Sequence, residues 1–370
     1  MGKTPTKKIL FLLHLPPPIH GSSVVGGYIK SSKLINENFS CTFLNVLAST
    51  SISKTGKVSS VKILSLFITL LKLVYTLIIK KPDLCYLALT TTGAAFFKDA
   101  LFVFVLKIFK VKRIYHLHNK GVARFQHKKI YKLFYKFVFK NAEVIILSIL
   151  LYDDIKDFVP SKRIHVCPNG IPPLNVTESL YQVEKLGCTI LFLSNLIESK
   201  GVNVLLKACA ILKMNKLNFK CKIIGGEGDI SEKGLKSSIS DMGLENFVFY
   251  EGKKYDNEKQ KAFLEADIFA FPTYYRNECF PLVLLEAMKY SLPIVATAEG
   301  GISDMVIEGQ NGFLTISKDE NLLFEKLQFL IKNEIRRRAM GLEGKKKFLN
   351  EFTLEKFEQK LSSIIKTCII

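Results

Sequence analysis

Two glutamates and a proline near residue 280 have a spacing that could bind a ligand. Residues 273–301 read TYYRNECFPLVLLEAMKYSLPIVATAEGG. Pro281 suits the first turn of a helix, where no amide hydrogen is missed, so we expect a helix that includes residues 284–289 and ends before Pro293. Glu278 then lies in the loop ahead of this helix, and Glu286 lies about one and a half turns inside it.

The start of this helix is a candidate anion site. The amides around Cys279, Phe280, Leu282 and Val283 would point outward at the positive end of the helix dipole. Phosphates on these amides and hydroxyls on the two carboxylates would suit a nucleotide-sugar. In the alternative interpretation both glutamates are solvated surface residues, although a carboxylate on so apolar a helix needs a partner. The spacing alone leaves both interpretations open.

Composition bounds the protein class. The chain has 370 residues, of which 48% are hydrophobic and 23% charged, which excludes a disordered tail, a collagen and a coiled coil. At roughly 150 residues per domain, the length predicts two domains or one large one. The 8 cysteines form no C-x-x-C pair, which argues against a zinc finger or a disulfide framework. We therefore expect a reducing, cytoplasmic compartment.

The positive charge is concentrated in one half of the chain. The net charge is +20; residues 1–170 hold 26 Lys and Arg against 7 Asp and Glu, and residues 171–370 hold 27 against 26. Such a field indicates an anionic partner, either nucleic acid or a membrane rich in acidic lipid. A general enrichment in lysine is the plainer explanation, but it leaves the neutral second half unexplained. No nucleic-acid-binding motif is present, so we expect a membrane and no nucleic acid.

The longest apolar stretch, residues 63–79, favours a position on the membrane surface. Its 17 residues contain Lys72 near the middle. A spanning helix needs about 20 apolar residues, and a central lysine costs roughly 2.5–3.5 kcal/mol on insertion. We expect a helix that is buried in a soluble domain or lies in a bilayer surface, held there by the flanking Lys57, Lys62, Lys80 and Lys81. The prediction is peripheral association with the inner face of the membrane.

Strands and helices alternate along both halves of the chain. In the first half we expect strands at 7–13, 41–46, 84–89, 112–117 and 143–147, and helices at 22–35, 63–79, 94–109 and 131–139. The pattern breaks at 168–173 (PNGIPP) and restarts with strands at 189–193, 220–224, 247–250, 268–271 and 294–297 and a helix at 201–214. This alternation predicts parallel α/β packing. The expected domains are 1–170 and 171–352, with a closing helix at 353–370 that packs back on the first domain; ligands of such sheets bind at the carboxyl ends of the strands.

The segment around residue 280 resembles a known signature. Glu278 and Glu286, followed by Ala287-Met288, by LPIVAT at 292–297 and by Gly300-Gly301, resemble the donor site of the family 4 retaining glycosyltransferases, also called group 1. The resemblance covers nearly the whole chain and is most specific over 189–314. It implies the GT-B fold, an α/β architecture of two facing, doubly wound Rossmann-like domains with a closing C-terminal helix.

The resemblance assigns residues in the second domain to the donor. Lys200 matches the second member of a basic pair that grips the diphosphate, whereas the first member, usually Arg, is Asn195 here; Arg276 or Lys253 could supply the missing charge. The glycine-rich turn after the next strand is matched by Gly225, Gly226 and Glu227, and the segment near the nucleobase contains Lys253. Cys279, Phe280, Leu282 and Val283 complete the implied donor site, with Glu286 on the ribose.

In the first domain the resemblance points to a glycine and a histidine. Gly21, after His20, stands where a glycine-bearing loop approaches donor and acceptor. His118 stands where the family has an active-site histidine near the sugar. His116 lies two residues earlier on the same strand face and is the rival candidate. For either histidine the alternative is a satisfied polar residue of the core.

The implied activity is transfer of a hexosyl or N-acetylhexosaminyl group from a UDP-, GDP- or other nucleotide-sugar to an acceptor hydroxyl, with retention. His118, Glu278 and Lys200 are the implied catalytic residues. The chain has no Asp-x-Asp motif, so we expect neither a metal nor a cofactor. The basic first domain favours a saccharide or lipid-linked acceptor in surface-polysaccharide synthesis. Alternatives are a nucleotide-sugar epimerase of this fold, an inactive nucleotide-sugar-binding protein, or a glycoside hydrolase, whose carboxylates would lie ~5–9 Å apart.

Overall fold

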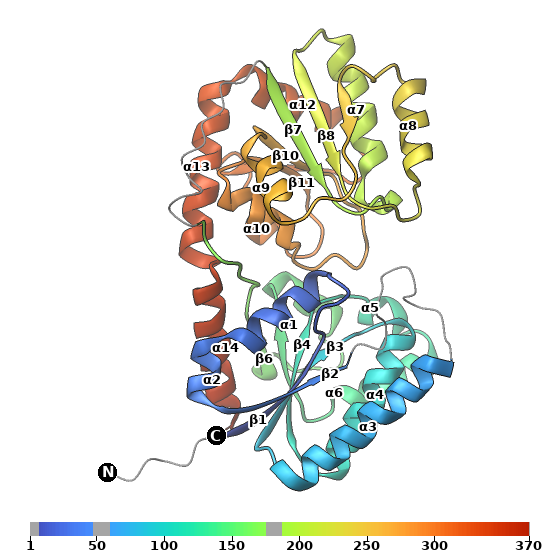
Figure 1. The fold of residues 1–370 in the computed structure, drawn as a ribbon, viewed down its shortest axis with the longest axis vertical. Coiled ribbons are helices and arrows are strands. Elements are labelled where there is room, and N and C mark those ends of the chain that lie inside the picture. The colour runs from blue at the N-terminus through green and yellow to red at the C-terminus, as the bar shows by residue number, and fades with distance from the viewer. Residues whose placement is uncertain (1–6, 47–59, 175–186, 370) are drawn as a thin grey trace. The chain divides into compact units, whose positions relative to one another are not determined.

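The computed structural model describes residues 7–46, 60–174 and 187–369 of the chain, with side chains in the first turn of the helix at residue 60 left out. It divides into two compact units (Figure 1). Unit 1 comprises residues 1–170 together with Leu354–Ile370, and unit 2 comprises Ile171–Thr353. Of the residues named above, Lys57 and Ile370 lie outside the described ranges, and so does the side chain of Lys62.

Unit 1 is built on a parallel sheet in the order β2-β1-β3-β4-β5-β6. Its strands are β1 (Lys8–Leu13), β2 (Ser40–Asn45), β3 (Leu84–Leu89), β4 (Lys112–Leu117), β5 (Glu143–Ile146) and β6 (Ile164–Val166). Its helices are α1 (Gly21–Ser31), α2 (Lys33–Asn38), α3 (Ser60–Lys80), α4 (Gly93–Ile108), α5 (Val122–Phe125) and α6 (Lys129–Phe139). Every residue of β3 is buried, as expected of a central strand covered on both faces.

Unit 2 has a second parallel sheet, in the order β12-β11-β10-β7-β8-β9. Its strands are β7 (Cys188–Leu193), β8 (Phe219–Ile224), β9 (Val248–Tyr250), β10 (Ile268–Phe271), β11 (Ile294–Thr297) and β12 (Gly312–Thr315). Its helices are α7 (Val202–Met214), α8 (Glu232–Asp241), α9 (Asp256–Leu264), α10 (Leu282–Lys289), α11 (Ile302–Met305), α12 (Glu320–Lys332) and α13 (Glu334–Glu351). The prediction of two doubly wound, Rossmann-like sheets is confirmed.

The last helix, α14 (Leu354–Ile369), belongs to unit 1. Figure 1 shows it beside α2. Lys366 Nζ donates to Asn38 Oδ1 at 2.7 Å, and Lys112 Nζ at the start of β4 donates to the Ile369 carbonyl at 2.7 Å. The two ends of the chain are therefore joined in one unit.

The predicted helix at 22–35 is wrong as a single element. The chain forms α1 and α2, separated by Ser32, whose backbone is extended and whose hydroxyl accepts from the Ile35 amide. The first helix begins at Gly21, with His20 as its N-cap. A capping side chain inside the predicted helix thus starts a second one, because serine competes for backbone amides.

α3 presents most of its apolar side chains to the surface of unit 1. Among the described helices it alone is long and apolar enough to cross a membrane, over Ile63–Lys80, and only 17% of that stretch is buried. Leu73 and Leu77 face the core, whereas Phe67, Leu71 and Tyr75 are more than half exposed. Of the two alternatives given for this helix, burial inside a soluble domain is therefore wrong, and a position in a bilayer surface stays a prediction.

Candidate donor-binding site

The sheet of unit 2 reverses its strand order between β7 and β10. These two strands are neighbours, but the chain continues from β7 to β8 on one side and from β10 to β11 on the other. Such a switch point, at the carboxyl ends of the strands, is the usual ligand site of an open α/β sheet. Lys200 lies in the loop after β7, and Glu278 lies in the loop after β10.

Hydrogen bonds from Tyr274 join the two loops. The Tyr274 amide donates to the Ser199 carbonyl at 2.7 Å, and the Tyr274 hydroxyl donates to Glu198 Oε1 at 3.0 Å. Gly201 has φ +89°, and a Cβ there would lie 2.0 Å from the Pro272 carbonyl oxygen. Only glycine allows this approach, and it fixes the position of Lys200 against the second loop.

The structure brings Lys200 and Glu278 into direct contact. Lys200 Nζ lies 2.5 Å from Glu278 Oε2, and the two side chains are 15% and 10% exposed. The ammonium also lies over the ring of Tyr275, 4.6 Å from its centroid. The interpretation of Glu278 as a solvated loop residue is therefore wrong. A phosphate group of a ligand can replace Glu278 as the partner of the Lys200 ammonium. A carboxylate oxygen of Glu278 is then available to accept a hydrogen bond from a sugar hydroxyl.

A glycine turn after β11 supports the loop that carries Glu278. Gly300 has φ +59°, and a Cβ there would lie 2.4 Å from the Glu278 carbonyl oxygen. The Gly301 amide donates to the Cys279 carbonyl at 2.6 Å. Cys279 and Phe280 are buried, with Phe280 packed edge-on against Phe352, so what they can offer a ligand is their backbone.

Glu286 lies on α10 and is paired with a residue of α9. Lys259 Nζ lies 2.5 Å from Glu286 Oε1, and the two side chains are 28% and 25% exposed. α10 begins at Leu282, with Pro281 as an extended N-cap residue rather than the first helical one, and no side chain caps it. The half-buried Leu282 and Val283 form its first turn. The apolar character of the helix indicated that Glu286 needs a partner, but sequence spacing could not identify Lys259.

The glycine-rich turn after β8 lies directly against the loop that contains Asn195. A Cβ on Gly225 would lie 1.7 Å from the Ser194 carbonyl oxygen, and the Leu196 amide donates to the Gly226 carbonyl at 2.7 Å. The Lys253 side chain covers Gly226, since a Cβ there would lie 1.8 Å from Lys253 Cε. Of the two cations proposed to compensate for Asn195, Lys253 therefore reaches the same turn.

Two residues of unit 2 that were predicted near the donor have exposed side chains, Glu227 and Arg276. Glu227 is exposed, and its Oε1 accepts from the Glu232 amide at 2.7 Å, so it supports the start of α8. Arg276 is exposed on the loop after β10. The structure thus places Lys200, Glu278, Asn195, Gly225, Gly226 and Lys253 on the loops at one end of the sheet, with Glu227 turned toward α8.

His118 lies at the carboxyl end of the unit 1 sheet, directly after β4. Its loop is held by Asn119, whose Oδ1 accepts from the Thr91 amide at 3.1 Å, and by Asp154, whose Oδ2 accepts from the Gly121 amide at 2.7 Å. Burial and the nearby His14 and His20 lower the pKa of His118 to about 3. The imidazole is therefore neutral near pH 7 and can exchange hydrogen bonds with a sugar without adding charge.

The rival histidine, His116, is a core residue. It is fully buried, and its Nδ1 lies 2.6 Å from the Tyr86 hydroxyl. Its ring lies tilted against that of His118, with 4.2 Å between the two centroids. Gly21 opens α1, and a Cβ there would meet no described atom within 4 Å, so its backbone is open to a ligand. Gly26 is the glycine that packing requires, since a Cβ on it would lie 2.0 Å from the His14 carbonyl oxygen.

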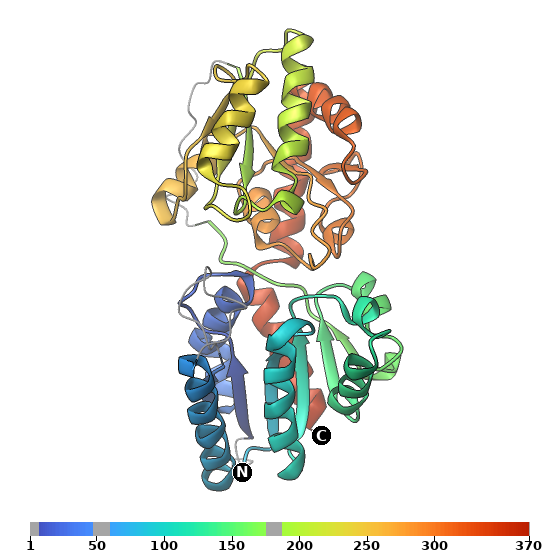
Figure 2. The ribbon, with the colours of Figure 1, turned by 90° about the vertical axis from the view of Figure 1, so that its right-hand side faces the viewer.

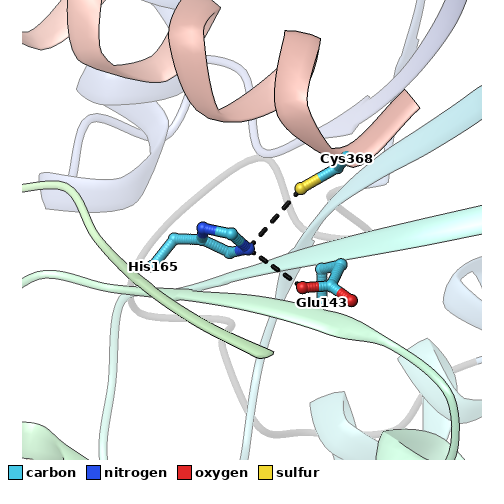
Figure 3. A group of neighbouring side chains, drawn as sticks. All are labelled: Glu143, His165 and Cys368. Carbon is cyan, nitrogen blue, oxygen red and sulfur yellow. Dashed lines mark hydrogen bonds and ion pairs between the residues drawn. The ribbon is translucent and has the colours of Figure 1, made fainter. Parts of the chain in front are cut away.

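One group of side chains in the described part of the chain could hold a metal ion. Figure 3 shows Glu143, His165 and Cys368 converging from β5, β6 and α14. His165 Nε2 lies 2.9 Å from Glu143 Oε2 and 3.6 Å from Cys368 Sγ. Burial raises the pKa of the Cys368 thiol to about 12, so a metal would have to displace its proton. Glu143 is the first residue of β5, so it lies at the end of the sheet opposite His118. The group therefore joins α14 to the sheet and is not part of a site near His118.

A cavity of unit 1 also lies away from these residues. It measures about 310 Å³ and is lined by β1, β2 and the end of α3, including Lys8, Thr76 and Lys80. Lys8 and Ser40 are the first residues of their strands, so this cavity is at the amino end of the unit 1 sheet. We assign the donor site from the switch point of unit 2 and the paired charges.

Comparison with known proteins finds a family that part of the chain resembles. Residues 184–347 match the family described as glycosyl transferases group 1. The amylovoran biosynthesis glycosyltransferase AmsK of Erwinia amylovora is 29% identical over 271 residues, which is 70% of this chain and 65% of that protein. The putative colanic acid biosynthesis glycosyltransferase WcaL of Salmonella typhimurium is 25% identical over 56% of this chain and 52% of that protein. The chain thus spans about half to two thirds of these relatives.

A solved structure shares the fold across both units. The Anabaena protein HepE, crystallised with UDP and glucose, superposes with a TM-score of 0.73 at 18% identity, covering 98% of this chain and 100% of that one. At this identity the likeness concerns the fold. Residues 184–347 of the chain are thus similar to the glycosyl transferases group 1 family, and its two parallel sheets have the GT-B fold.

Proposed function

We propose that this protein is a retaining glycosyltransferase that moves a hexosyl or N-acetylhexosaminyl group from a nucleotide-diphosphate sugar to an acceptor hydroxyl. The observation that carries the proposal is the buried Lys200–Glu278 pair at the switch point of unit 2, flanked by glycine turns. The Erwinia relative is named for amylovoran biosynthesis, and the Anabaena structure contains UDP and glucose. Both support a nucleotide-sugar donor and a role in surface-polysaccharide synthesis.

The chemistry requires stabilisation of the leaving group. As the bond between the sugar C1 and the β-phosphate oxygen breaks, negative charge develops on that phosphate. Lys200 and the amides at the start of α10 are suited to bind it, each good donor contributing about 3 kcal/mol. The acceptor oxygen bonds to C1 on the same face, and its proton passes to the departing phosphate. Glu278 binds the sugar hydroxyls, and neutral His118 contributes a hydrogen bond.

The acceptor follows from the charge of unit 1. Residues 1–170 have a net charge of +19, from 26 basic and 7 acidic residues, whereas residues 171–370 are nearly balanced. We infer that the acceptor is a saccharide carried on a lipid diphosphate, which a basic domain would attract. The enzyme would then work at the cytoplasmic face of a membrane.

Glu286→Ala should strongly reduce the thermal stabilisation that a nucleotide-sugar gives at a fixed concentration. The carboxylate, held by Lys259, would bind two ribose hydroxyls, and its loss should weaken donor binding at least about 10-fold, as expected for hydrogen bonds to a charged group. The measurement is a melting-shift screen of UDP- and GDP-sugars against wild type and variant. Glu325→Ala, an exposed glutamate on α12, is the matched control and should keep the shift. An unchanged shift in Glu286→Ala would remove Glu286 from the site.

Turnover assays separate this proposal from the alternatives. A transferase releases nucleoside diphosphate rapidly only when an acceptor is present. An epimerase converts the donor without an acceptor, and a hydrolase cleaves a simple glycoside. Stabilisation by the donor with none of these products would indicate an inactive binding protein.

Removal of divalent metal should leave transfer unchanged. The chain has no Asp-x-Asp motif to hold a metal on the diphosphate, and Lys200 and Lys253 can supply positive charge there instead. The rate of transfer would be compared before and after dialysis against EDTA. A loss of activity that Mg²⁺ or Mn²⁺ restores would contradict the expected metal independence.

A further inference from the structure

The outward side of α3 is apolar over most of its length. Ile63, Leu64, Phe67, Ile68 and Leu71 are each between 43% and 60% exposed. Their spacing of one, four, five and eight residues places them on one side of the helix. The opposite side carries Leu73 and Leu77, which are buried in unit 1. The fold therefore uses one apolar side of α3 and leaves a second one uncovered.

Two neighbouring helices extend this surface. α4 packs against both α3 and α6, and Figure 2 shows α3 and α4 running side by side on the face turned toward the viewer. Leu101, Phe104 and Ile108 on α4 are 44% to 60% exposed, and Ile130 and Leu133 on α6 are 57% and 66% exposed. We call these exposed side chains of α3, α4 and α6 the outer apolar face. Soluble monomers rarely expose an apolar patch that spans several elements.

The charge around the outer apolar face is almost entirely positive. Residues 60–140 contain sixteen Lys and Arg and two acids, Asp83 and Asp99. Asp99 is fully buried beside Lys98, so it does not offset the surface charge. Exposed lysines follow the ends of α3 and α4 and line α6, among them Lys80, Lys110 and Lys132. An apolar surface with a basic margin matches the acyl chains and the acidic headgroups of a membrane.

We propose that the outer apolar face docks unit 1 on an anionic lipid leaflet, with α3 lying in the interface rather than crossing it. Lys72 is exposed halfway along α3, where its long side chain can reach the headgroups. Leu73 and Leu77 tie the helix to the core of unit 1, which a spanning helix would have to leave. A second copy of the chain is a poor occupant, because two such basic margins would repel each other.

This inference rests on the proposed function, because transfer to a lipid-linked acceptor is the reason for the protein to bind a membrane. A transferase that is held on the leaflet meets a lipid-linked acceptor at high local concentration. Binding to vesicles itself requires no turnover, so the two ideas can fail separately. Donor-induced stabilisation and transfer to a soluble acceptor report on the site, whereas partition into lipid reports on the outer apolar face.

The test is co-sedimentation of the full chain with vesicles of phosphatidylcholine, with and without phosphatidylglycerol. We expect binding at least about 10-fold stronger to the anionic vesicles at low salt, with a partial loss at high salt, because salt screens the lysines but not the apolar contact. Equal binding to both vesicle types at low salt, or none to either, would overturn the proposal.

Substitutions locate the binding surface. The triple variant Phe67→Ser, Leu71→Ser, Phe104→Ser should lose at least about 10-fold in vesicle binding, as expected when three large apolar side chains no longer insert. Because all three side chains are more than half exposed, its melting temperature and donor-induced shift should stay as in wild type. The matched control is Ile316→Ser, Ile335→Ser, Leu342→Ser, which removes exposed apolar side chains from unit 2 and should bind vesicles normally.

Two results would assign the surface differently. If both triple variants lose binding equally, the effect is general hydrophobicity and the proposal fails. If wild type sediments as a dimer in solution and the Phe67, Leu71 and Phe104 variant is monomeric, the outer apolar face covers a second copy instead of lipid.

Discussion

Lys200→Ala should lower kcat/KM for glycosyl transfer by about 100-fold or more. The ammonium lies at the switch point of unit 2, where the diphosphate is expected, and loss of one such donor costs about 2.7–4 kcal/mol in the transition state. The measurement is nucleotide release in the presence of acceptor. Lys207→Ala, on the exposed part of α7, removes a lysine from the same region and should keep full activity. A Lys200→Ala variant with more than a tenth of wild-type activity would contradict the assignment.

The same substitution should also destabilise unit 2. Glu278 would be left as an unpaired charge with only 10% of its side chain exposed, which costs about 3–5 kcal/mol when a buried pair is broken. The double variant Lys200→Ala, Glu278→Ala removes both charges and should recover most of the lost melting temperature while remaining inactive. A stable but inactive double variant would show that the Lys200–Glu278 pair acts in transfer and not only in folding. Recovery of activity in the double variant would assign Lys200 to folding alone.

Unit 1 should lose stability steeply as the pH falls below 6.5. His14 and His116 are 8% and 0% exposed, and the ring of His118 lies against that of His116. Burial, with Lys98 and His20 nearby, lowers the pKa of His14 to about 3, and burial next to His118 lowers the pKa of His116 well below its usual value. His14 and His118 are therefore neutral in the folded state at pH 5, whereas a histidine of the unfolded chain binds a proton below its pKa of 6.5.

Proton linkage gives the direction in which folding stability changes with pH. The unfolded state binds more protons than the folded state between pH 6.5 and about 3, so folding stability rises with pH across this window and falls on acidification. The slope is at most about 1.4 kcal/mol per pH unit for each buried histidine. We expect the melting temperature of unit 1 to drop between pH 7 and pH 5, before most carboxylates titrate.

Two variants test whether the buried histidines cause the loss of stability between pH 7 and pH 5. His116→Gln should flatten the dependence of melting temperature on pH between 5 and 7, even if it lowers stability at pH 7 through the lost bond to Tyr86. His127→Gln, at an exposed position, is the control and should keep the wild-type slope. An equal slope in wild type and His116→Gln would show that His116 does not contribute.

Local sequence determined the central elements of both units. β3, β4, β10 and β11 begin and end at the predicted residues. β3 and β10 are runs of apolar residues, as a strand buried on both faces needs, whereas β4 begins with Lys112 and Arg113 and is buried only from Ile114 on. The edge strands β6 and β12 were not predicted. β6 is three residues long and only half-buried, so its pattern is too weak to stand out from a loop.

The sequence assigned single residues to the candidate site, but it did not show which of them form pairs. Lys200 and Glu278 were assigned separately, and only the structure shows that they touch, since they are 78 residues apart and meet because β7 and β10 are neighbours. Lys259 as the partner of Glu286 likewise depends on how α9 packs beside α10. Strand order arises from the sum of many weak contacts across the sheet, and no short stretch of sequence encodes it.

The outer apolar face shows the same division. The sequence determined that α3 is helical, apolar and edged with lysine. Which side of α3 enters the core was decided by its packing against α4 and the sheet, because an apolar helix offers several sides of similar hydrophobicity. Burial of Leu73 and Leu77 leaves Phe67 and Leu71 outside, and that choice is made only when the layers of unit 1 come together.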